Sequence, residues 1–392
     1  MQYRALGHSG VYVSSLGLGM MRLPLNDGSQ GFTGVSSGRV NVDASVTMLR
    51  RAVDLGVNYV DTAYNYLDGD SERITGLALL DGYREKVLLA TKAPTWLFKA
   101  PEDFDRYLDE QMERIGTDYI DVYLLHGMNR VSWSKTVLRH DILRKAEQAK
   151  AAGKIRFLGF SFHDDLDAFH SIVDYYDDWD LCQIQLNYLD TDFQAGLQGL
   201  EYAASHGLGV SIMEPLRGGY LARVPTDVRD IFASVRPERS PVEWALDFLW
   251  DRPEVGVVLS GMGSVTQVEE NVGYADRARP GMLTQMSKAV FDTVRAKLAA
   301  YPVIPCTGCA YCMHCPKRVA IPYNFLAYNE YQTTGDLERA RQYYKVQITP
   351  FGATAGACIA CGKCEEICPQ HIPISQWMPR IALLFGGTAE SV

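Results

Sequence analysis

Ile120-Asp-Val-Tyr-Leu-Leu-His126 and Ile155-Arg-Phe-Leu-Gly-Phe160 are two nearly continuous apolar runs, and the segment Ile142–Ala152 between them has helical periodicity. Apolar runs that alternate with helices are typical of parallel strands buried on both faces of a sheet. The 392-residue chain repeats this strand–helix unit from residue 15 to about residue 275. The stretch therefore predicts an α/β fold built on a parallel sheet.

Eight strands are expected in this sheet. They are Leu16–Gly19, Val57–Val60, Val87–Ala90, Ile120–Leu125, Ile155–Phe160, Leu181–Leu186, Gly209–Met213 and Val255–Leu259. Further helices are expected at Ser45–Leu55, Asp103–Ile115 and Leu200–His206. Eight parallel strands indicate closure into a (β/α)8 TIM barrel. A doubly wound open sheet is the alternative, but no G-x-G-x-x-G motif opens the first helix, which disfavours that fold.

The composition is that of an ordinary globular protein, with 47% hydrophobic and 22% charged residues. The net charge of −9 argues against nucleic acid or an anionic membrane as a partner. No apolar run approaches the roughly 18 residues that a membrane-spanning helix needs. No signal peptide is evident at the start of the chain. We therefore expect a cytoplasmic protein.

Eight of the nine cysteines follow residue 305, in two closely spaced runs. The runs are Cys306, Cys309, Cys312 and Cys315, and then Cys358, Cys361, Cys364 and Cys368. The second run matches the C-x2-C-x2-C-x3-C-P spacing of bacterial iron–sulfur proteins, and the first run has x2 in place of x3. Zinc is the alternative ligand, but zinc sites usually take two cysteine pairs separated by a longer loop. We expect two [4Fe–4S] clusters.

The two runs are expected to share their ligands. In two-cluster ferredoxins the cysteine before proline in each run binds the other cluster. By this rule the first three cysteines of the first run bind one cluster with Cys368, and the first three of the second run bind the other with Cys315. The short gap before Cys315 leaves open that it binds within its own run.

We expect two domains, a barrel over residues 1–300 and a small iron–sulfur domain over residues 301–392. A helix over residues 278–300 and the linker Tyr301–Pro305 are expected to join them. The segment Tyr323–Tyr344 is mostly helix-forming, so the second domain is expected to be mainly helical and ferredoxin-like.

Polar side chains follow four consecutive predicted strands. They are Asp61, Lys92, His126 and Ser161, at intervals of 31, 34 and 35 residues, and Tyr66 follows in the first loop. The carboxyl ends of barrel strands meet on one face, where barrel active sites lie. Each residue alone has an ordinary explanation, such as a helix cap or a surface charge. Their common register predicts an active site.

Three segments around these residues resemble the catalytic segments of the aldo-keto reductases. They are Asp61-Thr-Ala-Tyr-Asn-Tyr66, Ala90-Thr-Lys92 and Tyr123-Leu-Leu-His126, and the resemblance extends from about residue 16 to residue 271. It implies a (β/α)8 barrel that binds NADPH or NADH in an extended form.

The resemblance also implies roles for the four residues. Tyr66 would protonate the carbonyl oxygen of the substrate as general acid, and Lys92 would lower the pKa of Tyr66. Asp61 would pair with Lys92, and His126 would orient the carbonyl group. General physical chemistry is consistent with these roles, because a free tyrosine has a pKa near 10 and a neighbouring ammonium group favours the phenolate.

The resemblance implies a cofactor site as well. Ser161 and Gln183 would hold the nicotinamide carboxamide, with Gln185 as the alternative to Gln183, and Phe162 stands where the family has asparagine. Glu214-Pro-Leu-Arg-Gly-Gly219 resembles the loop over the pyrophosphate. The implied cofactor-binding residues are Gly19, Met20, Ser161, Gln183, Glu214, Leu216, Gly218, Gly261, Glu270 and Asn271.

The choice between NADH and NADPH depends on basic residues near the adenosine ribose, because a 2′-phosphate is normally held by arginine or lysine. The chain has no basic residue between Arg252 and Arg277, around the segment that resembles the adenosine end of the site. NADH is therefore expected to serve at least as well as NADPH.

Three aromatic side chains have two possible interpretations, and the remaining cysteine has one. Trp96, Phe98 and Trp133 either line a substrate pocket or pack within loops. Cys182, on a predicted strand, is expected to be a buried small apolar residue.

The expected function is NAD(P)H-linked reduction of a small-molecule carbonyl or oxidation of an alcohol, with clusters that exchange electrons with a redox partner protein. Hydride transfer moves two electrons and a cluster moves one, and no flavin motif is evident in the sequence. An ordinary reductase with structural or sensory clusters is one alternative. A non-catalytic redox-sensing subunit is another, although the complete set of four catalytic residues counts against it.

Overall fold

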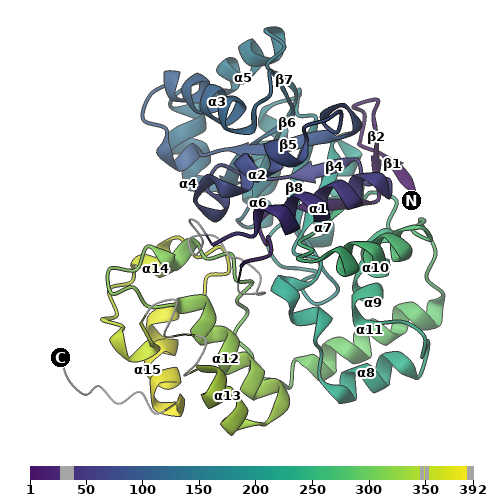
Figure 1. The fold of residues 1–392 in the computed structure, drawn as a ribbon, viewed down its shortest axis with the longest axis vertical. Coiled ribbons are helices and arrows are strands. Elements are labelled where there is room, and N and C mark those ends of the chain that lie inside the picture. Colours follow the sequence, from purple (N-terminus) through teal and green to yellow (C-terminus); the bar gives the residue numbers. More distant parts are fainter. Residues whose placement is uncertain (27–38, 345–347, 349–352, 386–392) are drawn as a thin grey trace. The chain divides into compact units, whose positions relative to one another are not determined.

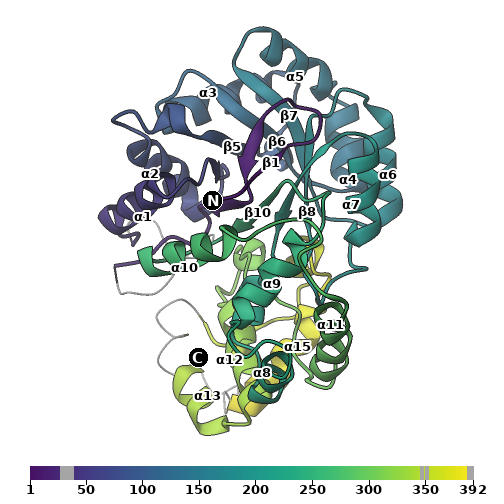
Figure 2. The same ribbon diagram turned by 90° about the vertical axis from the view of Figure 1, so that its right-hand side faces the viewer.

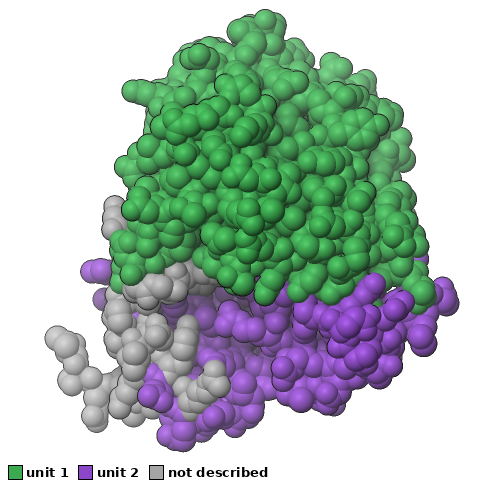
Figure 3. All heavy atoms as spheres, turned by 45° about the vertical axis from the view of Figure 1, so that its right-hand side comes forward, with its two compact units in different colours: residues 1–31, 36–215, 243–284 green, residues 32–35, 216–242, 285–392 purple. Residues whose placement is uncertain are grey.

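The computed structural model describes residues 1–26, 39–344, 348 and 353–385. Two compact units are present, and they are coloured separately in Figure 3. The first unit comprises the described residues of 1–31, 36–215 and 243–284, and the second those of 216–242 and 285–392. The second unit thus takes residues 216–242 from the middle of the chain.

Eight parallel strands form a closed barrel in the first unit, as predicted, so the open-sheet alternative is wrong (Figure 2). The strands are β3 (Leu16–Gly19), β4 (Tyr59–Asp61), β5 (Leu88–Ala93), β6 (Ile120–Met128), β7 (Ile155–Phe162), β8 (Leu181–Gln185), β9 (Gly209–Met213) and β10 (Val257–Ser260). The last strand pairs with the first, Val258 opposite Leu16, and this pairing closes the barrel.

Helices on the outside of the barrel follow most strands (Figure 1). They are α1 (Val42–Asp54), α2 (Asp70–Ala78), α3 (Glu102–Ile115), α4 (Arg130–Ser132), α5 (Ile142–Ala151), α6 (Leu166–Tyr175), α7 (Gly196–Ser205), α9 (Pro241–Trp250) and α10 (Val265–Ala275). In α3 the buried residues Phe104, Leu108 and Ile115 recur at helical spacing, so one stripe of the helix faces the sheet. Asn41 caps α1 and Asp165 caps α6 through side-chain oxygens.

An antiparallel hairpin precedes the barrel, and the sequence analysis did not predict it. Its strands are β1 (Tyr3–Ala5) and β2 (Tyr12–Ser14). Leu6 and Val13 pack in one buried cluster with the first residues of several barrel strands, among them Leu88, Leu181 and Val257. The hairpin therefore covers the amino ends of the strands, and the carboxyl ends lie on the other face of the barrel.

The second unit is mainly helical, as predicted for the iron–sulfur region. Its elements are η5 (Arg217–Ala222), α8 (Thr226–Ala233), α11 (Gln285–Leu298), η6 (Tyr311–Met313), α12 (Ile321–Thr334), α13 (Leu337–Tyr343), η8 (Ala355–Ala357), α14 (Lys363–Glu366) and α15 (Ile374–Phe385). Ile321, Phe325, Ile374 and Met378 are buried together in its core. Across the described part of the chain, no helix combines the length and the apolar character needed to cross a membrane.

Candidate active site

The four side chains predicted to be catalytic lie together at the carboxyl end of the barrel strands. Asp61 ends β4, Lys92 and His126 lie late in β5 and β6, and Tyr66 opens the 3₁₀ helix η1 (Tyr66–Gly69). The Lys92 Nζ atom donates to Asp61 Oδ1 at 2.6 Å and to the Tyr66 hydroxyl at 3.3 Å. The rings of Tyr66 and His126 meet edge to face with centroids 6.0 Å apart.

Lys92 and Asp61 form a buried ion pair, with only 1% of Lys92 exposed. Burial lowers the pKa of Lys92, and the neighbouring Asp61 carboxylate opposes this shift. Burial raises the pKa of Asp61, and Lys92 opposes it in turn. The Thr62 carbonyl accepts a further hydrogen bond from Lys92 Nζ at 2.8 Å. Each charge is tolerated in the interior because the other is present, so the loss of either one would leave an unpaired buried charge.

His126 is held by its backbone on both sides. The Thr95 hydroxyl donates to the His126 carbonyl oxygen at 2.9 Å, and the Gly127 amide donates to the Ser161 hydroxyl at 2.8 Å. Between Leu125 and Met128 the pairing of β6 with β7 shifts register. Irregular strand ends of this kind re-aim side chains beside active sites.

The imidazole of His126 is neutral at physiological pH. Burial, the charge of Lys92 and the nearby His163 all lower the pKa of His126 well below the ordinary value of 6.5. A neutral imidazole can donate one hydrogen bond but cannot serve as a strong acid. Of the two ring side chains that face each other here, Tyr66 is therefore the better proton donor.

This shift in the pKa of His126 predicts an acid sensitivity of the fold. Below pH 6.5 the unfolded chain binds a proton at His126 that the folded chain does not bind, so the unfolding free energy falls as pH falls. Between pH 6.5 and 5.5 this effect should amount to about 1 kcal/mol. Urea denaturation followed by tryptophan fluorescence at both pH values measures it. His126→Gln should lose this component and the exposed-site control His8→Gln should keep it; an equal loss in all three proteins would contradict the prediction.

A second buried carboxylate, which the sequence analysis missed, lies beneath Lys92. Glu72 on α2 is fully buried and accepts hydrogen bonds from Thr91 Oγ1 at 2.6 Å, Gln111 Nε2 at 2.5 Å and Arg114 Nη1 at 2.8 Å. Gln111 also donates to the Lys92 carbonyl oxygen at 3.2 Å. This network supports the end of β5 that carries Lys92. In the sequence Glu72 lies in a charged helix start and carries no sign of burial.

The turn that carries Tyr66 is strained. Leu67 and Asp68, the next two residues, have left-handed backbone angles with φ of 53° and 55°. Left-handed conformations cost a non-glycine residue about 1–2 kcal/mol each. Such strain persists only where the surrounding structure enforces it, and it is often found at functional sites.

Two of the predicted nicotinamide contacts lie side by side. Ser161 on β7 is paired in register with Gln183 on β8, and the Gln183 Oε1 atom is buried and makes no hydrogen bond within the described part of the chain. Gln185 and Asn187 instead donate to Asp190 Oδ2 at 3.3 Å and 3.0 Å. Gln183 therefore offers an acceptor to a bound amide, and this buried oxygen is what a nicotinamide carboxamide would satisfy.

The predicted residues of β3, β10 and α10 also gather in one place. Gly19, the last residue of β3, lies so close to Ser260 that a Cβ atom added to it would be 3.5 Å from the Ser260 carbonyl oxygen. Asn271 Nδ2 donates to Ser260 Oγ at 3.2 Å. Met20 is buried next to Gly19, and Glu270 is exposed on α10.

A basic residue from elsewhere in the sequence lies at this end of the site. The side chain of Arg22 crosses Gly261, where a Cβ atom would lie 3.3 Å from Arg22 Cδ. No local sequence signal connects Arg22 with residue 261. The fold thus brings one basic side chain to the segment between Arg252 and Arg277, which has none of its own, and this partly offsets the lack.

The remaining predicted cofactor residues lie in the loop after β9. Glu214 belongs to the barrel unit, where its carbonyl oxygen accepts a hydrogen bond from Asn187 Nδ2 at 3.1 Å. Leu216 and Gly218 belong to the second unit, where they lie at the start of η5.

The aromatic residues and Cys182 differ in their exposure to solvent. Trp96 is 52% exposed, and its ring centroid lies 5.2 Å from that of His126. Phe98, Trp133 and Phe162 are buried and pack on neighbouring aromatic rings. Cys182 is fully buried, as predicted.

Four cysteines line a small pocket in the second unit. Three of them, Cys358, Cys361 and Cys364, come from the second run, and Cys315 comes from the first. The apolar walls are Val319, Ile321, Ile359, Ile374 and Met378. Cysteines from both runs thus line one pocket, which fits the crossed ligand set for a cluster.

The other cysteines form a second group. Burial raises the pKa of Cys312 well above its ordinary value, and the neighbouring thiols of Cys309, Cys306, Cys368 and Cys364 raise it further. The backbone turn at Cys306 brings the Gly308 amide to 3.4 Å from its sulfur. Among the described residues no three His, Cys, Asp or Glu side chains converge closely enough to hold a single metal ion.

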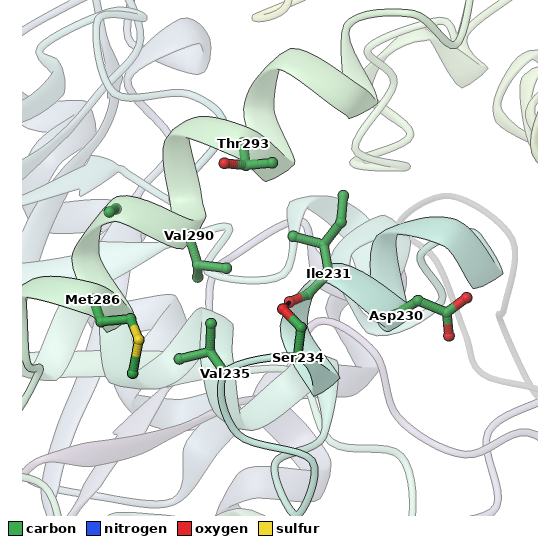
Figure 4. A pocket seen from close by; sticks show the side chains of 8 residues that line it. Asp230, Ile231, Ser234, Val235, Met286, Val290 and Thr293 are labelled. Carbon is green, nitrogen blue, oxygen red and sulfur yellow. Dashed lines mark hydrogen bonds between the residues drawn. The ribbon is translucent and has the colours of Figure 1, made fainter.

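A different hollow lies between α8 and α11 in the second unit (Figure 4). It is lined by Asp230, Ile231, Ser234, Val235, Met286, Ala289, Val290 and Thr293. None of the predicted catalytic, cofactor or cysteine residues lines it. Because its walls are mostly apolar and carry no constellation of reactive groups, we assign it no role in the chemistry.

Two family models match the chain. Residues 15–279, more than half of the chain, match the family model of the aldo/keto reductases. The chain belongs to the aldo/keto reductase family. Residues 305–372 match the model of a 4Fe-4S dicluster domain. The protein is therefore an NAD(P)-dependent oxidoreductase with an iron–sulfur domain after its reductase barrel.

Individual relatives of this aldo/keto reductase cover most of its barrel. The chain is 26% identical over 311 residues to an uncharacterized oxidoreductase, YqkF, of Bacillus subtilis, which covers 71% of this chain and 92% of the relative. It is 29% identical over 294 residues to L-galactose dehydrogenase of Arabidopsis thaliana, covering 69% and 87%. The holo form of an aldo-keto reductase from Bacillus halodurans matches with a TM-score of 0.60 at 25% identity, covering 75% and 96%.

Proposed function

We propose that the protein reduces a small-molecule carbonyl compound, or oxidises the corresponding alcohol, with Tyr66, Lys92, Asp61 and His126 acting at the carbonyl oxygen. The observation that carries this proposal is the position of Lys92 Nζ, 2.6 Å from Asp61 Oδ1 and 3.3 Å from the Tyr66 hydroxyl. A cation so placed favours the phenolate form of Tyr66 and so makes the Tyr66 hydroxyl a better proton donor.

Each residue has a distinct role in this proposal. A reduced nicotinamide cofactor, when bound, would supply the hydride that reduces the carbonyl carbon. Tyr66 gives a proton to the carbonyl oxygen, so the product is an alcohol. His126, which is neutral, donates a hydrogen bond to the same oxygen and orients it. Donors aimed at the oxygen on which charge develops stabilise the transition state more than the ground state. In alcohol oxidation the proton returns to Tyr66.

We assign the nicotinamide carboxamide to Ser161 and Gln183. The buried Gln183 oxygen, which has no hydrogen-bond partner among the described residues, supports this assignment, as does the register of Gln183 with Ser161. Gly19, Met20, Gly261, Glu270 and Asn271 are proposed to hold the adenosine side, and Glu214, Leu216 and Gly218 the pyrophosphate.

We expect NADH to bind at least as tightly as NADPH, because the segment between Arg252 and Arg277 supplies no basic residue of its own to pair with a 2′-phosphate and Arg22 offsets this only in part. Fluorescence titration with both dinucleotides gives the two dissociation constants. Strong selectivity for NADPH would contradict this prediction. Arg22→Gln is the informative variant, since Arg22 is the basic side chain over Gly261. If NADPH is preferred, this change should weaken the binding of NADPH and leave the binding of NADH unaffected.

We further propose that the second domain, residues 301–392, holds two [4Fe–4S] clusters that exchange single electrons with a protein partner, and that residues 1–300 form the catalytic domain. Cys306, Cys309, Cys312 and Cys368 are the ligands of one cluster, and Cys358, Cys361, Cys364 and Cys315 those of the other. The exposed Cys361 supports exchange with a partner at the second cluster. Free thiols in this number suit the reducing cytoplasm, and the net charge of −9 argues against a nucleic-acid partner.

A further inference from the structure

The loop assigned to the cofactor pyrophosphate lies directly against the loop that carries the first cysteines. Gly218, in η5, has a left-handed backbone with φ of +64°. A Cβ atom added to Gly218 would lie 2.7 Å from the Thr307 carbonyl carbon and 2.9 Å from Thr307 Cα. Thr307 lies between Cys306 and Cys309 in the chain. No side chain larger than hydrogen fits between these two loops without displacing the backbone.

The backbone around Thr307 is held in place. Thr307 is only 2% exposed. Three residues earlier, the Ile304 amide donates to Asn329 Oδ1 at 2.7 Å, and Asn329 Nδ2 donates back to the Ile304 carbonyl oxygen at 2.8 Å. On the other side the Gly308 amide lies 3.4 Å from Cys306 Sγ as a hydrogen-bond donor. Thr307 cannot move away from Gly218 without disturbing the two Ile304–Asn329 hydrogen bonds or the Cys306 sulfur.

The next residue, Gly219, provides a natural comparison. Its φ of +94° is also left-handed, but a Cβ atom there would meet only the tip of Arg223, at 4.0 Å. The Gly219 amide donates to the Leu216 carbonyl oxygen at 2.9 Å, so both glycines belong to the same ordered turn. An alanine at either position incurs the same kind of backbone penalty, and only the one at residue 218 meets Thr307.

We propose that the Cys306–Cys309 loop is a positioning element of the nicotinamide cofactor site, so that a cluster held by the first run and a cofactor held by the Gly218 loop stabilise each other. The inference rests on the proposed function, which places the pyrophosphate at Leu216 and Gly218. The two loops share one packed contact, so the arrangement that presents Cys306 to a cluster is also the one that supports Gly218. Such a coupling is reciprocal: cluster occupancy affects cofactor affinity by the same factor as the cofactor affects the cluster.

The first test compares two variants of the cluster-loaded protein, purified without oxygen. Gly218→Ala should raise the dissociation constant of NADH by about tenfold, within the range usual for coupled sites. Gly219→Ala carries the backbone penalty of the same turn without the contact with Thr307, so it should raise the constant by less than Gly218→Ala does. Fluorescence titration gives the three constants, and iron analysis shows whether each variant retains its clusters. Equal affinities in all three proteins would overturn the inference.

The second test needs no variant and so does not depend on how Gly218→Ala folds. Hydrogen–deuterium exchange of the parent protein is measured with and without saturating NAD⁺, and again after iron depletion. NAD⁺ should slow exchange in peptides covering residues 304–310, and iron depletion should speed exchange in peptides covering residues 216–222. Unchanged exchange in both segments would overturn the inference. If neither NADH nor NAD⁺ binds to the parent, the proposed function itself is wrong.

Discussion

Tyr66→Phe should lower the turnover of carbonyl reduction by about 10²–10⁴-fold, the usual effect of removing a positioned general acid. The phenylalanine ring keeps the packing beside His126 and Lys92 but has no proton to give. The affinity for NADH should be nearly unchanged, because Tyr66 is not among the proposed cofactor residues. Steady-state rates of NADH oxidation over a panel of aldehydes and ketones, with dissociation constants from fluorescence, separate the two quantities.

Tyr64→Phe is the matched control, since it removes a hydroxyl two residues away. The Tyr64 hydroxyl donates to Glu110 Oε1 at 3.0 Å and lies outside the Lys92 hydrogen bonds. This variant should keep parental rates. If Tyr66→Phe and the parent were equally active toward every carbonyl compound, the catalytic assignment would be refuted. The alternative of a non-catalytic redox-sensing subunit would then gain support.

Cys315→Ser and Cys368→Ser should each remove one cluster, and each should act on the run to which it does not belong. Cys315 lines the pocket of Cys358, Cys361 and Cys364, and Cys312 has both Cys368 and Cys364 of the second run among its neighbours. A protein with two [4Fe–4S] clusters contains about eight irons, so each variant should retain about four. Iron and sulfide analysis of anaerobically purified protein measures the loss, and electron paramagnetic resonance of the reduced protein identifies the remaining cluster.

The ninth cysteine supplies the control. Cys182 is buried on β8 in the barrel, so Cys182→Ala should keep all of the iron. Pairing each serine variant with a substitution in the opposite run tests the crossed ligand set directly. Cys315→Ser combined with Cys364→Ala should lose no more than one cluster, since both residues are assigned to the same one. Loss of all iron in this double variant would instead place Cys315 in its own run.

Several features of the fold could be read from periodicity. Near-continuous apolar runs such as Ile120–Leu125 indicated buried parallel strands, and the eight strands close as predicted. The hairpin over the amino ends was missed because β1 and β2 have only three residues each and carry no strong alternation. The helix predicted over residues 278–300 begins only at Gln285, and the segment Tyr323–Tyr344 divides into two helices.

The sequence by itself determined the barrel, the common register of Asp61, Lys92 and His126, and the two cysteine runs. These features follow from local spacing: strand–helix units of similar length bring their ends to one face, and thiolates two residues apart can wrap one cluster. Only the tertiary structure decided which distant residues support the site.

Three such cases are Glu72 beneath Lys92, Arg22 over Gly261 and Thr307 against Gly218. Their positions depend on how helices and loops pack onto the strands. Close packing selects partners by shape and by unsatisfied polar groups, and neither property is encoded in the spacing of residues along the chain.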